Sequence, residues 1–91
     1  MRILLIVLTM VIAAGAALAC DVGRPVVFAG MDWQSNAFHT AVAQKVLEAG
    51  YNCKTDVLPG TTIPLLQGVA QGDIDVVMEV WKDNVTEVWN R

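Results

Sequence analysis

The sequence has little positive charge, a single histidine and no cluster of metal-binding side chains. After the first 19 residues it holds five Lys and Arg against nine Asp and Glu, a formal charge of −4. This balance argues against a nucleic-acid-binding protein, which would present a basic surface. His39 has no cysteine or serine at a catalytic spacing, and the two cysteines form no CxxC motif. We therefore predict no metal site, no cofactor and no enzymatic activity.

The first 19 residues have the pattern of an export signal. Arg2 precedes an apolar run over residues 3–19, which ends in the small-x-small motif Ala17-Leu18-Ala19. The run is slightly shorter than the ~20 apolar residues of a membrane span. We therefore predict a cleaved signal peptide over residues 1–19 rather than a retained anchor. Cys20 after the cut keeps a lipoprotein as an alternative, although the residues before it stand in the wrong order for lipid attachment.

Both cysteines, Cys20 and Cys53, lie in the segment that remains after cleavage. In an exported protein such a pair predicts a disulfide, with two free thiols as the alternative. Closing a loop of this length stabilises a folded chain by about 3–4 kcal/mol. The gain matters because a 72-residue unit buries only about 60% of its unfolded surface.

The segment after residue 19 alternates between strand-like and helix-like stretches. The helix at 35–50 has Ser35 as its expected N-cap and Gly50 at its expected C-terminal turn. Its apolar residues recur at helical spacing, as in an amphipathic helix: Phe38, Ala41, Val42 and Val46. The other predicted elements are strands at 25–30, 51–58 and 73–80 and helices at 61–72 and 82–91.

This β-α-β-α-β-α order predicts an α/β fold with a parallel sheet in the strand order 2-1-3. In that order the first and third strands are neighbours, and a crevice opens at their carboxyl ends, where open α/β sheets bind ligands. Trp33 follows the first strand and Trp81 ends the third. The sequence therefore predicts that both indoles stand at one crevice.

Two indole faces suit a particular class of ligand. Their negative quadrupole attracts cations, and a quaternary ammonium loses little by leaving water. The alternative is that either ring is only a hydrophobic plug. Glu79, close to Trp81 in the sequence, is a candidate to support or contact the cation, whereas Asp73 and Asp75 are expected at the opposite end of their strand. Trp89 is expected on the apolar face of the last helix.

Four motifs, in this order and spacing, resemble the start of the glycine betaine/choline substrate-binding proteins of ABC transporters. They are D-W-x-S at 32–35, LEAGYNC at 47–53, PGTTIP at 59–64 and GDIDVVMEVW at 72–81. The resemblance covers essentially all of residues 20–91. It implies a type II periplasmic binding protein, with two lobes that close on the ligand. Since two lobes of ordinary size need a longer chain, we expect residues 20–91 to form only the N-terminal part of lobe one.

The resemblance also implies a function and a set of site residues. Trp33 and Trp81 match positions of an aromatic cage around a quaternary ammonium such as glycine betaine, proline betaine or choline. Ser35 falls where some choline binders have a polar ligand contact, although serine departs from the acidic residue expected there. Cys20 and Cys53 match a pair that some members bridge. The implied partner is an ABC permease in the inner membrane, served from the periplasm for osmoprotectant uptake. The alternative is a small secreted interaction module stapled by its disulfide, without a role in transport.

Overall fold

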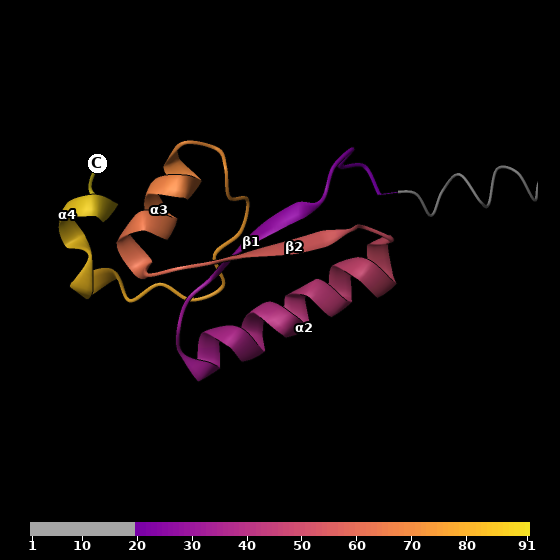
Figure 1. The fold of residues 1–91 in the computed structure, drawn as a ribbon, viewed down its shortest axis with the longest axis horizontal. Helices are drawn as coiled ribbons and strands as arrows, with labels where there is room; N and C mark the ends of the chain where they lie inside the picture. Colours follow the sequence, from indigo (N-terminus) through magenta and orange to yellow (C-terminus); the bar gives the residue numbers. More distant parts are fainter. Residues whose placement is uncertain (1–19) are drawn as a thin grey trace, which may run out of the picture.

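The computed structural model describes residues 20–91. The predicted signal peptide, residues 1–19, lies outside the described residues. Along the described chain the elements alternate as β1, α2, β2, α3, η1 and α4. In Figure 1, α2 runs along the sheet formed by β1 and β2, while α3 and α4 lie together beyond the carboxyl ends of the two strands. The α/β class is therefore confirmed for this part of the chain.

The sheet consists of two parallel strands, β1 (Val26–Gly30) and β2 (Thr55–Pro59). Each residue of β1 lies opposite one of β2, with Phe28 opposite Val57. Gly30 ends β1 against the side chain of Val57, since a Cβ added at Gly30 would lie 2.6 Å from Val57 Cγ1. A larger residue at this position would require the Val57 side chain to move. The strand-like run of the sequence therefore ends in glycine for a steric reason.

The third strand predicted at 73–80 is reduced to one isolated parallel bridge between Val76 and Phe28. Two further backbone bonds hold the same place, Ala29 N to Val76 O at 2.9 Å and Asp75 N to Val27 O at 2.8 Å. The pairing stops after Val76, although β1 continues for two residues beyond Phe28, so the length of β1 does not account for it. The sheet of the described residues has the order β1-β2, and the wider order 2-1-3 stays a prediction.

Helix α2 (Gln34–Tyr51) begins and ends at residues other than those predicted. Trp33, in an extended conformation, is the N-cap in place of Ser35, and no side chain caps this end. The helix continues through Gly50 and ends at Asn52, whose φ of 54° is left-handed. Asparagine tolerates this conformation better than other residues with a Cβ. The sequence therefore contained two suitable C-terminal residues, and the later one ends the helix.

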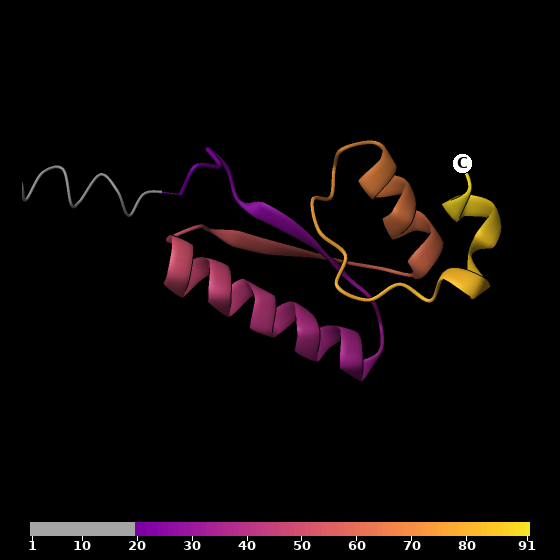
Figure 2. The same cartoon turned by 180° about the vertical axis from the view of Figure 1, so that it is seen from behind.

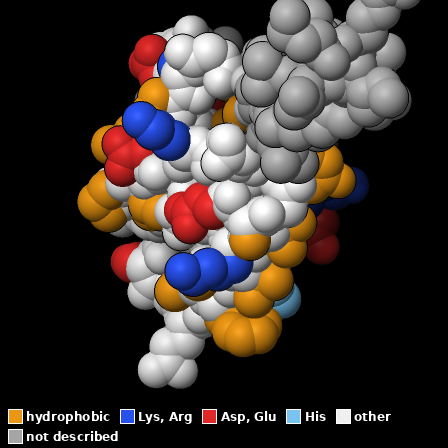
Figure 3. All heavy atoms as spheres, turned by 90° about the vertical axis from the view of Figure 1, so that its right-hand side faces the viewer, with side chains coloured by type: hydrophobic (Ala, Val, Ile, Leu, Met, Phe, Trp, Pro, Cys, Tyr) orange, Lys and Arg blue, Asp and Glu red, His pale blue; other side chains and the backbone are white. Residues whose placement is uncertain are grey.

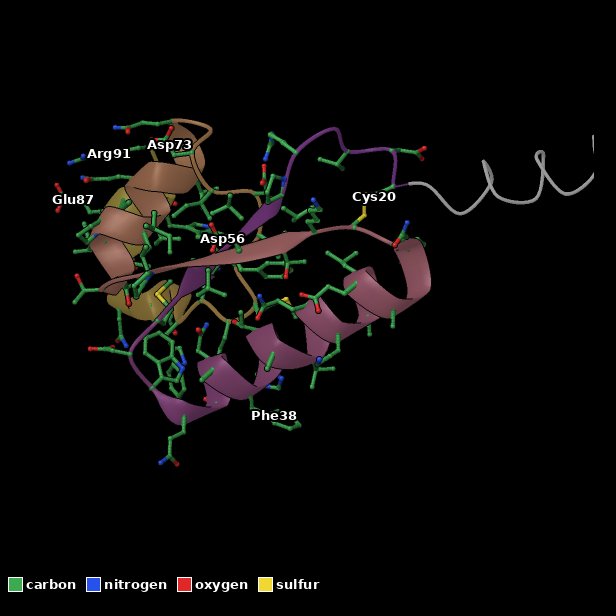
Figure 4. All side chains as sticks on the ribbon, turned by 45° about the vertical axis from the view of Figure 1, so that its right-hand side comes forward. Cys20, Phe38, Asp56, Asp73, Glu87 and Arg91 are labelled. Carbon is green, nitrogen blue, oxygen red and sulfur yellow. A yellow bond between two sulfur atoms is a disulfide. The ribbon has the colours of Figure 1, made fainter. Side chains whose placement is uncertain are left out.

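The apolar stripe of α2 faces solvent instead of the sheet. Phe38 is 66% exposed and points away from the ribbon in Figure 4. The opposite face packs on the sheet with polar side chains: Asn36 and Thr40 are buried, and Gln44 donates to Thr55 at 2.9 Å. The Asn36 Oδ1 and the Gln44 amide find hydrogen-bond partners there. The Asn36 Nδ2 is buried without a partner among the described residues. Figure 3 shows hydrophobic side chains on both flanks of one face of the molecule. Those exposed on α2 include Phe38, Val42 and Val46.

The remaining helices lie beyond the carboxyl end of the sheet, as Figure 2 shows from behind. Helix α3 (Thr62–Ala70) is followed by a turn at Gly72, whose φ of 85° favours glycine. The single helix predicted at 82–91 is divided into η1 (Lys82–Asn84) and α4 (Thr86–Trp89). The main hydrophobic core joins β1 to α3 and to the segment that follows α3. It consists of Ala29, Met31, Leu65 and Ile74.

A disulfide joins Cys20 to Cys53, as predicted, with a sequence separation of 33. It ties the chain ahead of β1 to the turn between α2 and β2, close to the start of β2 in Figure 4. Val26 N donates to Lys54 O at 2.9 Å immediately beside this crosslink. Both strands are therefore held together at their amino ends. Among the described residues, no helix is long and apolar enough to cross a membrane.

Candidate functional site

Each of two tryptophans stands immediately before a helix at the carboxyl end of the sheet. The carbonyl of Trp33 accepts the first backbone bond of α2 from Ala37 N at 3.1 Å, and the carbonyl of Trp81 accepts from Asn84 N at 3.1 Å to start η1. A residue in this place has an extended backbone on one side and a helix on the other. The side chain consequently projects from a corner of the chain and can reach into the space between elements.

Both indoles line one pocket of about 360 Å³, together with Thr62, Asn84 and Val85. Trp33 is half-buried and packs against the hydrophobic core, whereas Trp81 is 57% exposed. The pocket is of the size that small molecules occupy. The structure thus brings together the two tryptophans that the sequence placed at one crevice. Trp89 lies elsewhere, in a separate groove with the side chains of α3.

Glu79 links the third predicted site residue, Ser35, to Trp81. The Ser35 hydroxyl donates to the carboxylate of Glu79 at 2.9 and 3.1 Å. The indole N–H of Trp81 donates to the same carboxylate at 2.9 Å. Ser35 does not line the pocket itself. It is connected to the pocket through Glu79, which touches both the start of α2 and the second indole.

The pKa of Glu79 lies below the ordinary value of a glutamate. The indole N–H of Trp81 contributes most to this shift, followed by the indole of Trp33, while partial burial acts in the opposite direction. Ser35 and the nearby His39 lower the pKa further. The N–H of Trp33 faces this carboxylate but lies outside hydrogen-bond geometry and is buried without a partner. Glu79 is therefore a stable anion at neutral pH, set beside both indoles.

Asn36, which the sequence analysis did not single out, holds the turn that carries Trp33. The residue is fully buried, and its Oδ1 accepts a bond from Met31 N at 2.9 Å. Thr40 donates a longer bond to the same oxygen, at 3.5 Å. The turn from β1 into α2 is thus fixed by a side chain within the helix it leads to. The available signal was an asparagine in the first turn of a helix, a residue that favours side-chain bonds to nearby backbone.

A second interaction that sequence reasoning missed anchors the chain ahead of Trp81. The guanidinium of Arg24 binds the carboxylate of Asp75 through two bonds of 2.7 Å. The same carboxylate accepts from Val27 N at 2.9 Å. Bonding to Arg24 lowers the pKa of Asp75 far below its usual range. The sequence indicated Asp75 only as the entry to a strand, and no local pattern identifies a partner 51 residues away.

The pocket is lined by two aromatic side chains, Trp33 and Trp81, with a carboxylate hydrogen-bonded to the N–H of Trp81. Among residues 20–91, no three His, Cys, Asp or Glu side chains are grouped as metal ligands. In general an aromatic face attracts an organic cation without supplying a ligand bond.

Comparison with known proteins identifies the family. The matching family, over residues 24–91, is the substrate-binding domain of ABC-type glycine betaine transport systems. Neither a search of curated proteins nor a search of solved structures found a match. The family is a non-enzymatic component of transport. Since the match covers most of the chain and includes the elements that form the pocket, the protein belongs to this family of glycine betaine substrate-binding domains.

Proposed function

We propose that the protein captures a quaternary ammonium compound, such as glycine betaine, proline betaine or choline, and delivers it to an ABC permease in the inner membrane. The observation that carries this proposal is the pocket that Trp33 and Trp81 line together. The membership in the family supports the transport role. Export through the predicted signal at residues 1–19 would place the protein in the periplasm, where an importer receives its substrate.

Capture rests on the two indole faces, since each desolvated contact with a cation contributes about 0.5–2 kcal/mol. Trp33 supplies a wall that the core holds in place, and Trp81 supplies a wall at the solvent edge. Ser35 completes the polar side of the site through its bond to Glu79. In the wider sheet, the segment around Val76 takes the third place in the order 2-1-3, supported by its parallel bridge to β1.

Tryptophan fluorescence titrated with glycine betaine, proline betaine and choline tests this function. We expect saturable changes that are weakened by Trp33→Leu and by Trp81→Leu, because leucine keeps the apolar contact but removes the aromatic face. Each loss should be about 2- to 30-fold in affinity. Trp89→Phe is the matched control, since Trp89 lies outside the pocket, and it should leave affinity unchanged.

Circular dichroism of each variant verifies the fold before the titrations are compared. The absence of any response to the three ligands would contradict the proposed ligand class. Equal weakening by the Trp89→Phe control would contradict the assignment of the pocket.

A further inference from the structure

We propose that Glu79 is the residue that makes the indole pocket selective for positive charge, acting through the ring of Trp81, which it holds. This inference rests on the proposed function and names the charge-sensing residue of the same site. Glu79 does not line the pocket. Its carboxylate is instead bound to the edge of Trp81, so it acts on a ligand as a positioning residue and as a fixed negative charge behind the aromatic wall.

The first part of the argument is geometric. The carboxylate of Glu79 accepts from Trp81 Nε1 at 2.9 Å and from the Ser35 hydroxyl at 2.9 and 3.1 Å. Ser35 lies in the first turn of α2, directly after the corner that carries Trp33. Glu79 thus ties the exposed indole of Trp81 to the start of α2, which directly follows the half-buried Trp33. Without this bridge, Trp81 would depend on the short η1 and on contacts at the pocket edge.

The second part of the argument is electronic. A hydrogen bond from the indole N–H to an anion shifts electron density toward the ring face, which strengthens the attraction of that face for a cation. The same carboxylate adds a direct Coulomb attraction, which solvent screens in part because its hydrogen bonds lie in an exposed place. Neither effect acts on a neutral ligand of the same shape. Charge selectivity is therefore the property that separates this role from simple support.

The charged groups around the carboxylate are consistent with this role. His39, from the first half of α2, is the titratable neighbour that acts on it through its charge. No Lys or Arg side chain is bonded to Glu79 in the part of the chain that the structure describes, where both ion pairs involve other residues. Its partners are the neutral donors Ser35 and Trp81. Within the described residues its negative charge is therefore not paired with a Lys or Arg, although His39 partly offsets it.

The test compares choline with 3,3-dimethylbutan-1-ol, a neutral molecule of nearly the same shape, by isothermal titration calorimetry. Glu79→Gln keeps an oxygen that accepts from Trp81 but removes the charge. We expect it to weaken choline by about 5- to 10-fold and to leave the neutral alcohol within about 2-fold. Glu87→Gln, the same change on an exposed glutamate of α4 outside the pocket, is the matched control and should alter neither affinity.

A second measurement follows the indole N–H signal of Trp81 by NMR, without ligand. In the parent protein this signal should shift as pH is lowered through the titration of Glu79, and the shift should be absent in Glu79→Gln. The signal is assigned with Trp81→Phe. This readout distinguishes a carboxylate held against the ring from a glutamate that merely lies nearby.

Four outcomes overturn the inference. Equal weakening of choline and of the neutral alcohol by Glu79→Gln would reduce Glu79 to structural support. An unchanged choline affinity in Glu79→Gln would contradict the link between Glu79 and the Trp81 ring. An indole N–H signal of Trp81 that does not shift with pH would contradict the same link. If the parent protein binds no quaternary ammonium, the proposed function fails and the charge selectivity with it. If the parent binds choline and only the Glu79 comparison fails, the proposed function stands alone.

Discussion

The two walls of the pocket come from regions that are held in different ways. The β1–α2–β2 region carries Trp33 and is joined by a five-residue parallel ladder and a disulfide. The segment at 73–84 carries Trp81 and reaches the same strand through one isolated bridge and the Arg24–Asp75 ion pair. The first region has a continuous strand ladder and a covalent link, whereas the second pairs with β1 at one bridge and contributes Ile74 to the core.

This difference assigns separate roles to the two indoles. Trp33 is half-buried on the core and serves as the fixed wall, while Trp81, more than half exposed, is set by its hydrogen bond to Glu79. Regions with few buried contacts open at lower free energy than the rest of a protein. We therefore expect the Trp81 wall to adjust to a ligand and the Trp33 wall to stay in place.

Removing the disulfide should have the largest effect, confined to the more rigid region. In the double variant Cys20→Ser and Cys53→Ser, the free energy of unfolding should fall by about 3–4 kcal/mol, because a loop with a separation of 33 residues is released in the unfolded chain. Urea denaturation measures this change. Reduction of the parent protein should reproduce it, and a loss below about 1 kcal/mol would show that other contacts hold the amino ends of the strands.

Asn36→Ala should have a smaller effect on the same region. It leaves the buried Met31 N–H without its acceptor, at a cost of about 1–3 kcal/mol. The midpoint of urea unfolding and the emission maximum of Trp33 should both shift, since the turn before this ring loses its support. Gln34→Ala, an exposed change in the same helical turn, is the control. Equal behaviour of the two variants would contradict the role given to Asn36.

Asp75→Asn should have the smallest effect at neutral pH and a distinctive dependence on pH. The pKa of Asp75 is lower in the folded than in the unfolded chain, because Arg24 and Val27 N bind the charged form. Its contribution to stability is therefore complete above about pH 4, the value of a free aspartate, and is lost as the pH falls below that value. Unfolding midpoints at pH 7 and pH 3 should differ less in Asp75→Asn than in the parent protein.

Asp73→Asn, an exposed change without an ion pair, is the control for this experiment and should retain the parent's dependence on pH. Its behaviour matters because acid lowers the stability of most proteins through many carboxylates at once. If Asp75→Asn and Asp73→Asn show the same dependence of stability on pH, the Arg24–Asp75 ion pair does not stabilise the segment at 73–84.

Local patterns in the sequence predicted much of the fold. The strand ending in Gly30, the helix after Trp33 and the disulfide each follow from residues that are adjacent or few in number. The third strand was over-predicted because the continuous apolar run at 73–80 signals burial but not a pairing partner. Within the described residues this run is bridged to β1 at Val76, although β1 itself continues from Phe28 to Gly30.

The helix faces could not be read from hydrophobicity alone. The face of α2 that packs on the sheet carries Asn36, Thr40 and Gln44, while Phe38 lies outside. This choice follows from hydrogen bonds to Met31 and to Thr55 that form only in the folded chain. In the site, too, contacts between residues distant in the sequence could not be predicted from local patterns. The two indoles were predicted from their places after strands, whereas the bridging role of Glu79 depends on contacts across 44 residues.

The position of the Cys20–Cys53 crosslink has a practical consequence. It lies ahead of both strands, whereas the indoles follow them, so the two features occupy opposite ends of the sheet. Protein produced in a reducing cytosol would lack this bond while keeping every side chain of the pocket. Material for calorimetry is therefore best prepared by secretion or by oxidative refolding, with the thiol content assayed before any affinity is compared.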